Sequence, residues 1–136
     1  NLIGSRFNDM LRGSDGMNVI EGGDGNDQIF GRGGMDTLAG GNGDDTLDGG
    51  ARNDVLIGGA GNDVLTGGAD RDTFVFLAPN QGTDRIMDFQ AGLDKIELGA
   101  GFNIANGFNF VVGSAATSAG ASVVYNPQTG ALVFDA

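Results

Sequence analysis

A nine-residue repeat runs through the first half of this chain and constrains its fold more than any other feature. Gly40–Asp48 reads GGNGDDTLD, and the pattern returns in Gly49–Ile57 and Gly58–Thr66. Eight such repeats follow one another without an insertion, and they begin at Gly4, Gly13, Gly22, Gly31, Gly40, Gly49, Gly58 and Gly67. A short fixed period predicts that each repeat is one structural unit that stacks on its neighbours.

The eighth position of every repeat is large and apolar, which indicates an inward side chain. These residues are Leu11, Ile20, Ile29, Leu38, Leu47, Leu56, Leu65 and Phe74. Positions seven and nine vary freely, so we expect strands of about three residues with one buried side chain between two exposed ones. Two repeats then form one right-handed coil, and successive coils add parallel strands to two facing sheets. The sequence therefore predicts an all-β fold, a right-handed parallel β-roll (a two-sheet β-helix), over residues 1–76.

The turns between these strands have the composition of a site for a hard cation. Glycines at positions one, two and four permit positive φ angles and let backbone carbonyls converge. Position six adds a carboxylate in most repeats: Asp9, Asp27, Asp36, Asp45, Asp54, Asp63 and Asp72. Such oxygens suit calcium, which takes about six to eight ligands. The chain has no His or Cys, so a zinc or copper site would lack its usual ligands.

Alternate repeats return to the same edge of the coil, so the acidic side chains are expected to stack in two columns. One edge carries Asp9, Asp27, Asp45 and Asp63, and the other carries Asn18, Asp36, Asp54 and Asp72. Adjacent coils lie about 4.8 Å apart, so a cation between them contacts both carboxylates, with about six such sites at most. The pattern is broken by Phe7, Asn18, Arg32 and Arg52. The other candidate metal ligands in the turns are Gly22, Gly23, Gly25, Gly31, Gly34, Gly40, Gly41, Gly43, Gly49, Gly50, Gly58, Gly59, Gly61, Asp24 and Asn42.

The period stops after Phe76, and residues 77–136 read as a β-rich segment that caps the open end of the roll. Residues 121–125 and 131–134 have the pattern of a hairpin. Two acidic residues here, Asp84 and Asp88, have two interpretations. They form a further pair of calcium ligands beside the last coil, or they are solvated strand charges.

Composition narrows the class of protein. A net charge of −11 and 27 glycines in 136 residues are typical of a disordered acidic linker, but 40% of the residues are hydrophobic and recur in register. The acidic balance argues against nucleic-acid binding. No apolar run is long enough to span a membrane, and there is no cysteine for a disulfide. The chain begins at Asn1 without a signal peptide, so we expect a fragment of a longer protein.

These residues resemble the C-terminal RTX region of bacterial proteins exported by type I secretion, such as serralysin-type proteases, lipases, mannuronan epimerases, haemolysins, adhesins and S-layer proteins. The resemblance covers residues 4–75, continues through Thr83–Leu98 and includes the hairpin Val123–Phe134. It implies that the position-six aspartates and the turn carbonyls bind several calcium ions. It also implies a secreted, extracellular parent that passes through the type I secretion apparatus, with residues 77–136 leading toward the secretion signal.

Three functions are consistent with the sequence. The first is a non-catalytic module that folds on binding calcium, unfolded in the cytosol and folded outside the cell, which supports export and stabilises the parent. The second is an interaction module for a polysaccharide or a cell surface, with outward residues such as Phe30, Ile57 and Val75 as its face. The third is an enzyme. Histidine- and cysteine-based catalysis is impossible here, whereas a glycosidase with paired carboxylates stays open. We expect no catalysis in this segment, and any active site of the parent is expected upstream.

Overall fold

The computed structural model describes residues 1–78, 81–90, 92–99, 111–112, 122–126 and 131–135. Its strands are β1 (Leu2–Ile3), β2 (Met10–Arg12), β3 (Val19–Asp24), β4 (Gln28–Gly33), β5 (Thr37–Asn42), β6 (Thr46–Ala51), β7 (Val55–Ala60), β8 (Val64–Ala69), β9 (Thr73–Phe76), β10 (Arg85–Ile86), β11 (Lys95–Leu98), β12 (Val111–Val112), β13 (Ser122–Asn126) and β14 (Ala131–Asp135). None of the described residues belongs to a helix long and apolar enough to cross a membrane.

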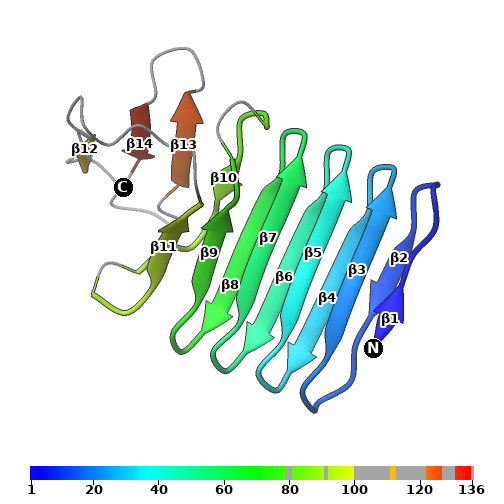
Figure 1. Cartoon of the computed structure of the whole chain (residues 1–136). Coiled ribbons are helices and arrows are strands. Elements are labelled where there is room, and N and C mark those ends of the chain that lie inside the picture. The colour runs from blue at the N-terminus through cyan, green and yellow to red at the C-terminus, as the bar shows by residue number, and fades with distance from the viewer. Residues whose placement is uncertain (79–80, 91, 100–110, 113–121, 127–130, 136) are drawn as a thin grey trace.

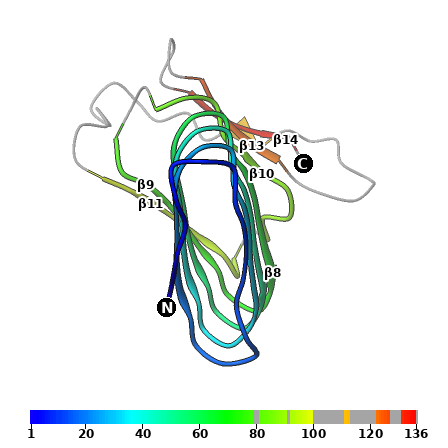
Figure 2. The ribbon, with the colours of Figure 1, turned by 90° about the vertical axis from the view of Figure 1, so that its right-hand side faces the viewer.

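Two sheets contain all of these strands (Figure 1). Sheet A has the order β1-β3-β5-β7-β9-β11, and sheet B has the order β12-β14-β13-β10-β8-β6-β4-β2. Successive strands of the repeats therefore alternate between the sheets. Figure 2, turned by 90° from Figure 1, shows the coils one behind another as a flattened loop with a sheet on each long side.

The register confirms that two repeats make one coil. Ile20 pairs with Leu38 and Leu38 with Leu56 in sheet A, and each neighbour lies two repeats further along the chain. Ile29 pairs with Leu47 in the same way in sheet B. All pairings among the repeats are parallel, as predicted for a β-roll.

The strands are longer than the three residues expected from the repeat. Strands β3 to β8 each have six residues, because positions one to three of the next repeat continue the strand. In β4, for example, Ile29 and Gly31 are both buried, whereas Gln28 and Arg32 are exposed. Position one faces inward, and a glycine there extends the pleat without adding a side chain.

The core is a double column of position-eight side chains. Those from Ile20 to Phe74 are fully buried, and Phe76 and Ile86 join them, with Leu11 partly buried at the first coil. Phe89 packs on this core beyond the repeats, with its ring centroid 6.2 Å from that of Phe74. Each coil contributes only two large apolar residues, so the apolar core is thin.

The parallel ladders continue past Phe76. Strand β10 pairs with β8, so that Ile86 lies beside Leu65, and β11 pairs with β9, so that Ile96 lies beside Phe74. The predicted hairpin is confirmed as β13 and β14, and β13 pairs antiparallel with β10. The division of the chain at residues 76 and 77 stays a prediction, since the ladders cross that point without a break. Ala121 and most of the predicted hairpin turn lie outside the described residues.

Truncating a core side chain should be costly in so thin a core. We expect Leu47→Ala to lower the free energy of unfolding by about 2–5 kcal/mol, because Leu47 is fully buried and a cavity would remain. Leu77→Ala is the matched control, since Leu77 is 53% exposed. Urea unfolding at saturating calcium measures both variants. Equal losses in the two would contradict the assignment of the core.

Candidate metal centre

The position-six aspartates form two hydrogen-bonded columns, one on each edge of the roll. The first edge consists of the turns at residues 4–9, 22–27, 40–45 and 58–63, and the second of those at 13–18, 31–36, 49–54 and 67–72. On both edges Oδ1 of one aspartate accepts a hydrogen bond from the backbone N–H of the position-six residue one coil earlier. Asp27 donates in this way to Asp45 at 2.8 Å, and Asp36 to Asp54 at 2.7 Å. The structure thus places these side chains as the sequence predicted, in two stacks along the roll.

The second oxygen of each carboxylate is buried without a hydrogen-bond partner. This holds for Oδ2 of Asp27, Asp36, Asp45, Asp54, Asp63 and Asp72. Each of these residues is only 1% exposed. A buried carboxylate oxygen that meets no donor is strongly unfavourable unless a cation or a proton compensates it. Six such atoms in two regular columns indicate a repeated missing partner rather than a local irregularity.

The position-one glycines make room for these oxygens. A Cβ added to Gly31 would lie 2.5 Å from Oδ2 of Asp36, in the same repeat, and 2.6 Å from the carbonyl oxygen of Gly49. Both contacts also arise at Gly22, Gly40 and Gly49, and the contact with Oδ2 arises at Gly58 and Gly67 as well. The sequence allowed positive φ at positions one, two and four, but none of the position-one glycines adopts it. They are small because the carboxylate and a carbonyl fill the space where a side chain would lie.

Beyond the first coil, positions two and four have positive φ angles. They include Gly23, Gly25, Gly34, Gly41, Gly43, Gly50, Gly59 and Gly61. A Cβ at Gly43 would collide with the carbonyl oxygen of Gly25 in the preceding coil, and the same relation holds along the edge. Carbonyl oxygens of positions two and four therefore stack from coil to coil along each edge. Arg32, Arg52 and Asp70 adopt φ angles of 83°, 87° and 80° at such positions, which is strained for residues with a side chain.

Burial and mutual repulsion raise the affinity of the columns for protons. Burial, followed by nearby carboxylates, raises the pKa of Asp54 to about 7 and the pKa of Asp45 and Asp72 to about 6, although a backbone N–H opposes the shift in each. Burial also raises the pKa of Asp63 and of Asp84, which contact each other. Carboxylates that take up protons near neutral pH are also carboxylates whose charge a cation would stabilise.

The first coil is built differently. Oδ2 of Asp9 accepts hydrogen bonds from the backbone N–H and the hydroxyl of Ser5, at 2.6 and 2.8 Å. Asn18 carries no charge, and its side-chain oxygen accepts from the N–H and hydroxyl of Ser14. Serines replace the position-two glycines in both turns, so this coil satisfies its position-six side chains locally. The sequence pattern predicted that the first coil departs from the other repeats, because Phe7 and Asn18 break the pattern there. The serines were not recognised as the cause.

Both columns extend beyond the repeats. Asp63 donates its N–H to Oδ1 of Asp84 at 3.0 Å, and Asp72 donates to Oδ1 of Asp94 at 3.0 Å. Asp84 is 5% exposed and continues the first column. Asp88 does not join it, because its two oxygens accept hydrogen bonds from the N–H groups of Gly67 and Gly68. Sequence reasoning missed Asp94. The signal was present, since Asp94 stands two residues before Ile96, the spacing that relates each position-six aspartate to position eight.

Two other candidates, Asp24 and Asn42, lie away from the columns. Both are exposed, and the Asn42 amide donates to Oδ1 of Asp24 at 2.8 Å. A further ladder of position-five side chains runs along the same edge, where Asp44 donates its N–H to Asn26 and Asn62 donates to Asp44. Its signal was an eighteen-residue recurrence of Asn or Asp that the nine-residue period obscures.

The donor set fits a hard cation. Each central turn offers an unpartnered carboxylate oxygen next to stacked carbonyl oxygens, which is the ligand chemistry of calcium. No three acidic side chains converge on one point among the residues that the structure describes. Carbonyls of the turns would therefore complete the coordination. The central aspartates would hold the ion, and its charge would neutralise the buried column.

Neutralising one central carboxylate should weaken calcium binding specifically. We expect Asp45→Asn to lower the number of bound calcium ions and to raise the calcium concentration at half-folding at least severalfold, because Asp45 supplies a buried unpartnered oxygen. Asp44→Asn is the control, with the same charge change at an exposed neighbour. Calorimetric titration with calcium measures both. An equal effect of the two variants would show that net charge alone controls binding.

The raised pKa values predict opposite effects of acid with and without calcium. Between pH 4 and 7 the calcium-free fold binds more protons than the unfolded chain, since the pKa of Asp54 is about 7 in the fold and the ordinary pKa of an aspartate is 3.8. Its stability therefore falls as pH rises through that window. Protons compete with calcium, so the calcium midpoint should rise as pH falls below about 7. Circular dichroism with EGTA at pH 5 and pH 8, and calcium titrations at each pH, measure both effects. A calcium midpoint independent of pH would contradict this prediction.

The repeats match one known family. Residues 3–38 and 39–74 each match the model of the RTX calcium-binding nonapeptide repeat (4 copies), and together they cover more than half of the 136 residues. Compared with curated proteins, the chain shows no significant match. The matched residues are those that form the coils and both aspartate columns of the roll. The chain therefore belongs to the family of RTX calcium-binding nonapeptide repeats.

Proposed function

We propose that this chain is a calcium-driven folding module of a larger secreted protein. It is unfolded where calcium is scarce, folds outside the cell, and thereby supports type I export and stabilises the parent. The observation that carries the proposal is the set of six buried, unpartnered carboxylate oxygens along the roll. The matched family binds calcium, and a calcium ion at these positions would provide the positive charge that the buried carboxylates need.

The energetics favour coupled folding and binding. Glycine-rich turns lose much conformational entropy on folding, and each coil buries only two large apolar residues in return. Without cations, the stacked carboxylates add repulsion within a chain of net charge −11. Extracellular calcium sites commonly have dissociation constants of about 10⁻⁴–10⁻³ M, so millimolar calcium fills them whereas cytosolic calcium does not. The binding free energy then becomes folding free energy.

The same calcium-dependent folding would support export. A chain that is unfolded on the inside can pass through a narrow channel, and folding on the calcium-rich side opposes its return. No catalytic role is part of this proposal, because the periodic aspartates are explained as ligands.

We expect the chain at pH 8 to show a β-sheet circular dichroism spectrum and a cooperative thermal transition in millimolar calcium, and neither in EGTA. The triple variant Asp45→Asn, Asp54→Asn, Asp63→Asn should require more calcium to fold. Asp15→Asn, Asp44→Asn, Asp70→Asn is the control with the same charge change at exposed positions. A chain that is equally folded in calcium and in EGTA would refute the proposal.

The same variants test the export role. Each is placed between a reporter and a type I export signal, and secreted reporter is measured with and without external calcium. Export should depend on calcium for the parent chain and the exposed-site control, and less so for the buried-site triple variant. If folding depended on calcium but export did not, the export role would be rejected. The module would then only stabilise the parent protein.

A further inference from the structure

The outer face of sheet B carries a small basic cavity near the first coils. Arg12 of β2 and Phe30 and Arg32 of β4 line a cavity of about 290 Å³. Arg12 and Phe30 occupy the outward position nine of their repeats and are Cα partners in the parallel ladder. This places them on the opposite face of the roll from Ile57 and Val75, which belong to sheet A. The predicted common face of Phe30, Ile57 and Val75 is therefore not formed.

The cavity is preorganised. The guanidinium carbon of Arg12 lies 5.5 Å from the centroid of the Phe30 ring, and its Nη2 donates to Sδ of Met10 at 3.4 Å. These two contacts hold the Arg12 side chain over the aromatic ring instead of leaving it mobile. A guanidinium held in this way loses less entropy when it binds an anion.

Arg32 departs from the repeat pattern. It occupies position two with a φ of 83°, whereas the equivalent residues of the other central repeats are glycines: Gly23, Gly41, Gly50, Gly59 and Gly68. A side chain at such a backbone angle costs stability, and strain of this kind concentrates at binding sites. The strained arginine is the one that brings a second guanidinium to the cavity. In a chain of net charge −11, neither Arg12 nor Arg32 forms a salt bridge with any described carboxylate.

The neighbour on the far side of Phe30 narrows the choice of ligand. Asp48 of β6 is the next Cα partner of Phe30, and no described group donates a hydrogen bond to its carboxylate. Two guanidinium groups bind a carboxylate, and a flat aromatic and guanidinium surface packs against the face of a ring. An unpaired carboxylate accepts hydrogen bonds from hydroxyl groups. Asp48 would also repel a second anionic group in that direction. The size of the cavity, at the small end for ligand sites, suits a single ring.

We propose that Arg12, Phe30 and Arg32, with Asp48 beside Phe30 on the next strand, form a binding site for a sugar acid, a hydroxylated ring that carries one carboxylate. The site lies on the face of a sheet, outside both calcium columns. It therefore adds a recognition function to the calcium-binding module and does not depend on its role in export.

The test uses the full chain at a fixed, saturating calcium concentration and follows amide shifts by NMR. D-glucuronate should bind saturably and shift the resonances of Arg12, Phe30 and Arg32. D-glucose, acetate, benzoate and inorganic phosphate should each bind at least tenfold more weakly. Glucose lacks the carboxylate, acetate lacks the ring, benzoate lacks the hydroxyls and phosphate is an anion alone. Equal or tighter binding of any of the four would overturn the assignment to sugar acids.

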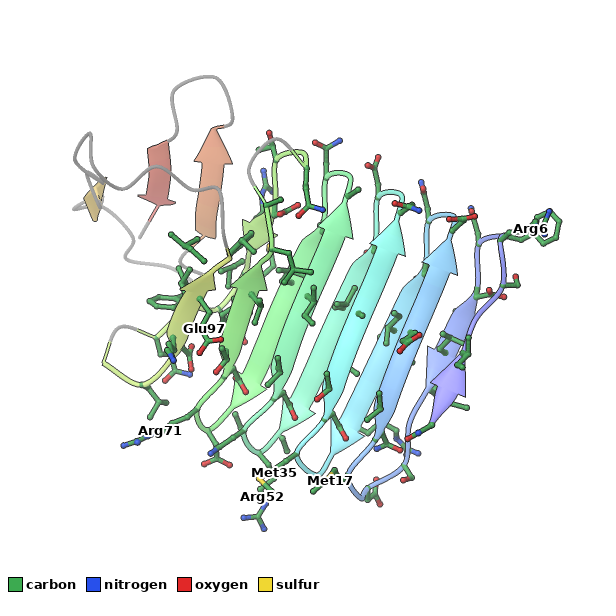
Figure 3. The ribbon with its side chains drawn as sticks, in the orientation of Figure 1. Arg6, Met17, Met35, Arg52, Arg71 and Glu97 are labelled. Carbon is green, nitrogen blue, oxygen red and sulfur yellow. The ribbon has the colours of Figure 1, made fainter. Side chains whose placement is uncertain are left out.

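Two arginine variants make the test specific. Arg32→Gly restores the glycine of neighbouring repeats, so it should fold at least as well as the parent chain while weakening glucuronate binding at least tenfold. Arg52→Gly is the matched control, because Arg52 is also exposed, has a φ of 87° and loses the same charge. Figure 3 shows Arg52 on a turn of the second edge, pointing away from the roll. Its glucuronate affinity should stay within twofold of the parent's. Equal losses in the two variants would show a general charge effect and reject the site.

Discussion

The constraint on which this structure depends is a carboxylate oxygen that is buried in a turn and accepts no hydrogen bond. It recurs in six turns, and the rest of each repeat is arranged around it. The glycine at position one leaves space for it, the N–H of the preceding coil orients its partner oxygen, and at Asp36 the carbonyl of the next position-one glycine, Gly49, lies close to the same space. The apolar residue at position eight packs in the core between the two sheets. Since the same atoms order the turn and would attract the cation, the proposed function makes folding and calcium binding one process.

The aspartate columns explain why the core can be so thin. A globular domain of this size relies on a broad apolar interior, whereas here two facing ladders of single side chains suffice to align the coils. In the proposed function, the large stabilising contribution comes from calcium bound at the edges, which depends on solution conditions in a way that apolar burial does not. Calcium and protons would act on the same carboxylates, because burial raises the pKa of Asp54 to about 7 and the pKa of Asp45 to about 6.

Much of this arrangement could be predicted from the sequence because the repeat is strict. Position eight defined the inward column, and the period of nine defined the pairing of Ile20 with Leu38. Two features escaped because they depend on context in three dimensions. The role of Gly31 is set by an oxygen of Asp36 that reaches across the turn, which no backbone propensity reveals. Asp94 escaped because the connection before it is longer than a repeat, although its spacing to Ile96 is kept.

The direction of the hydrogen bonds between coils has a consequence for how the roll could be divided. In both columns the earlier coil supplies the N–H and the later coil supplies the acid. The exposed ladder of Asn26, Asp44 and Asn62 runs with the opposite sense. A chain severed between two coils therefore ends in two surfaces with matching donors and acceptors. Separate halves of this roll would be complementary fragments, because each exposes the hydrogen-bonding groups that the other lacks. Calcium bound between the two cut surfaces would help to join them.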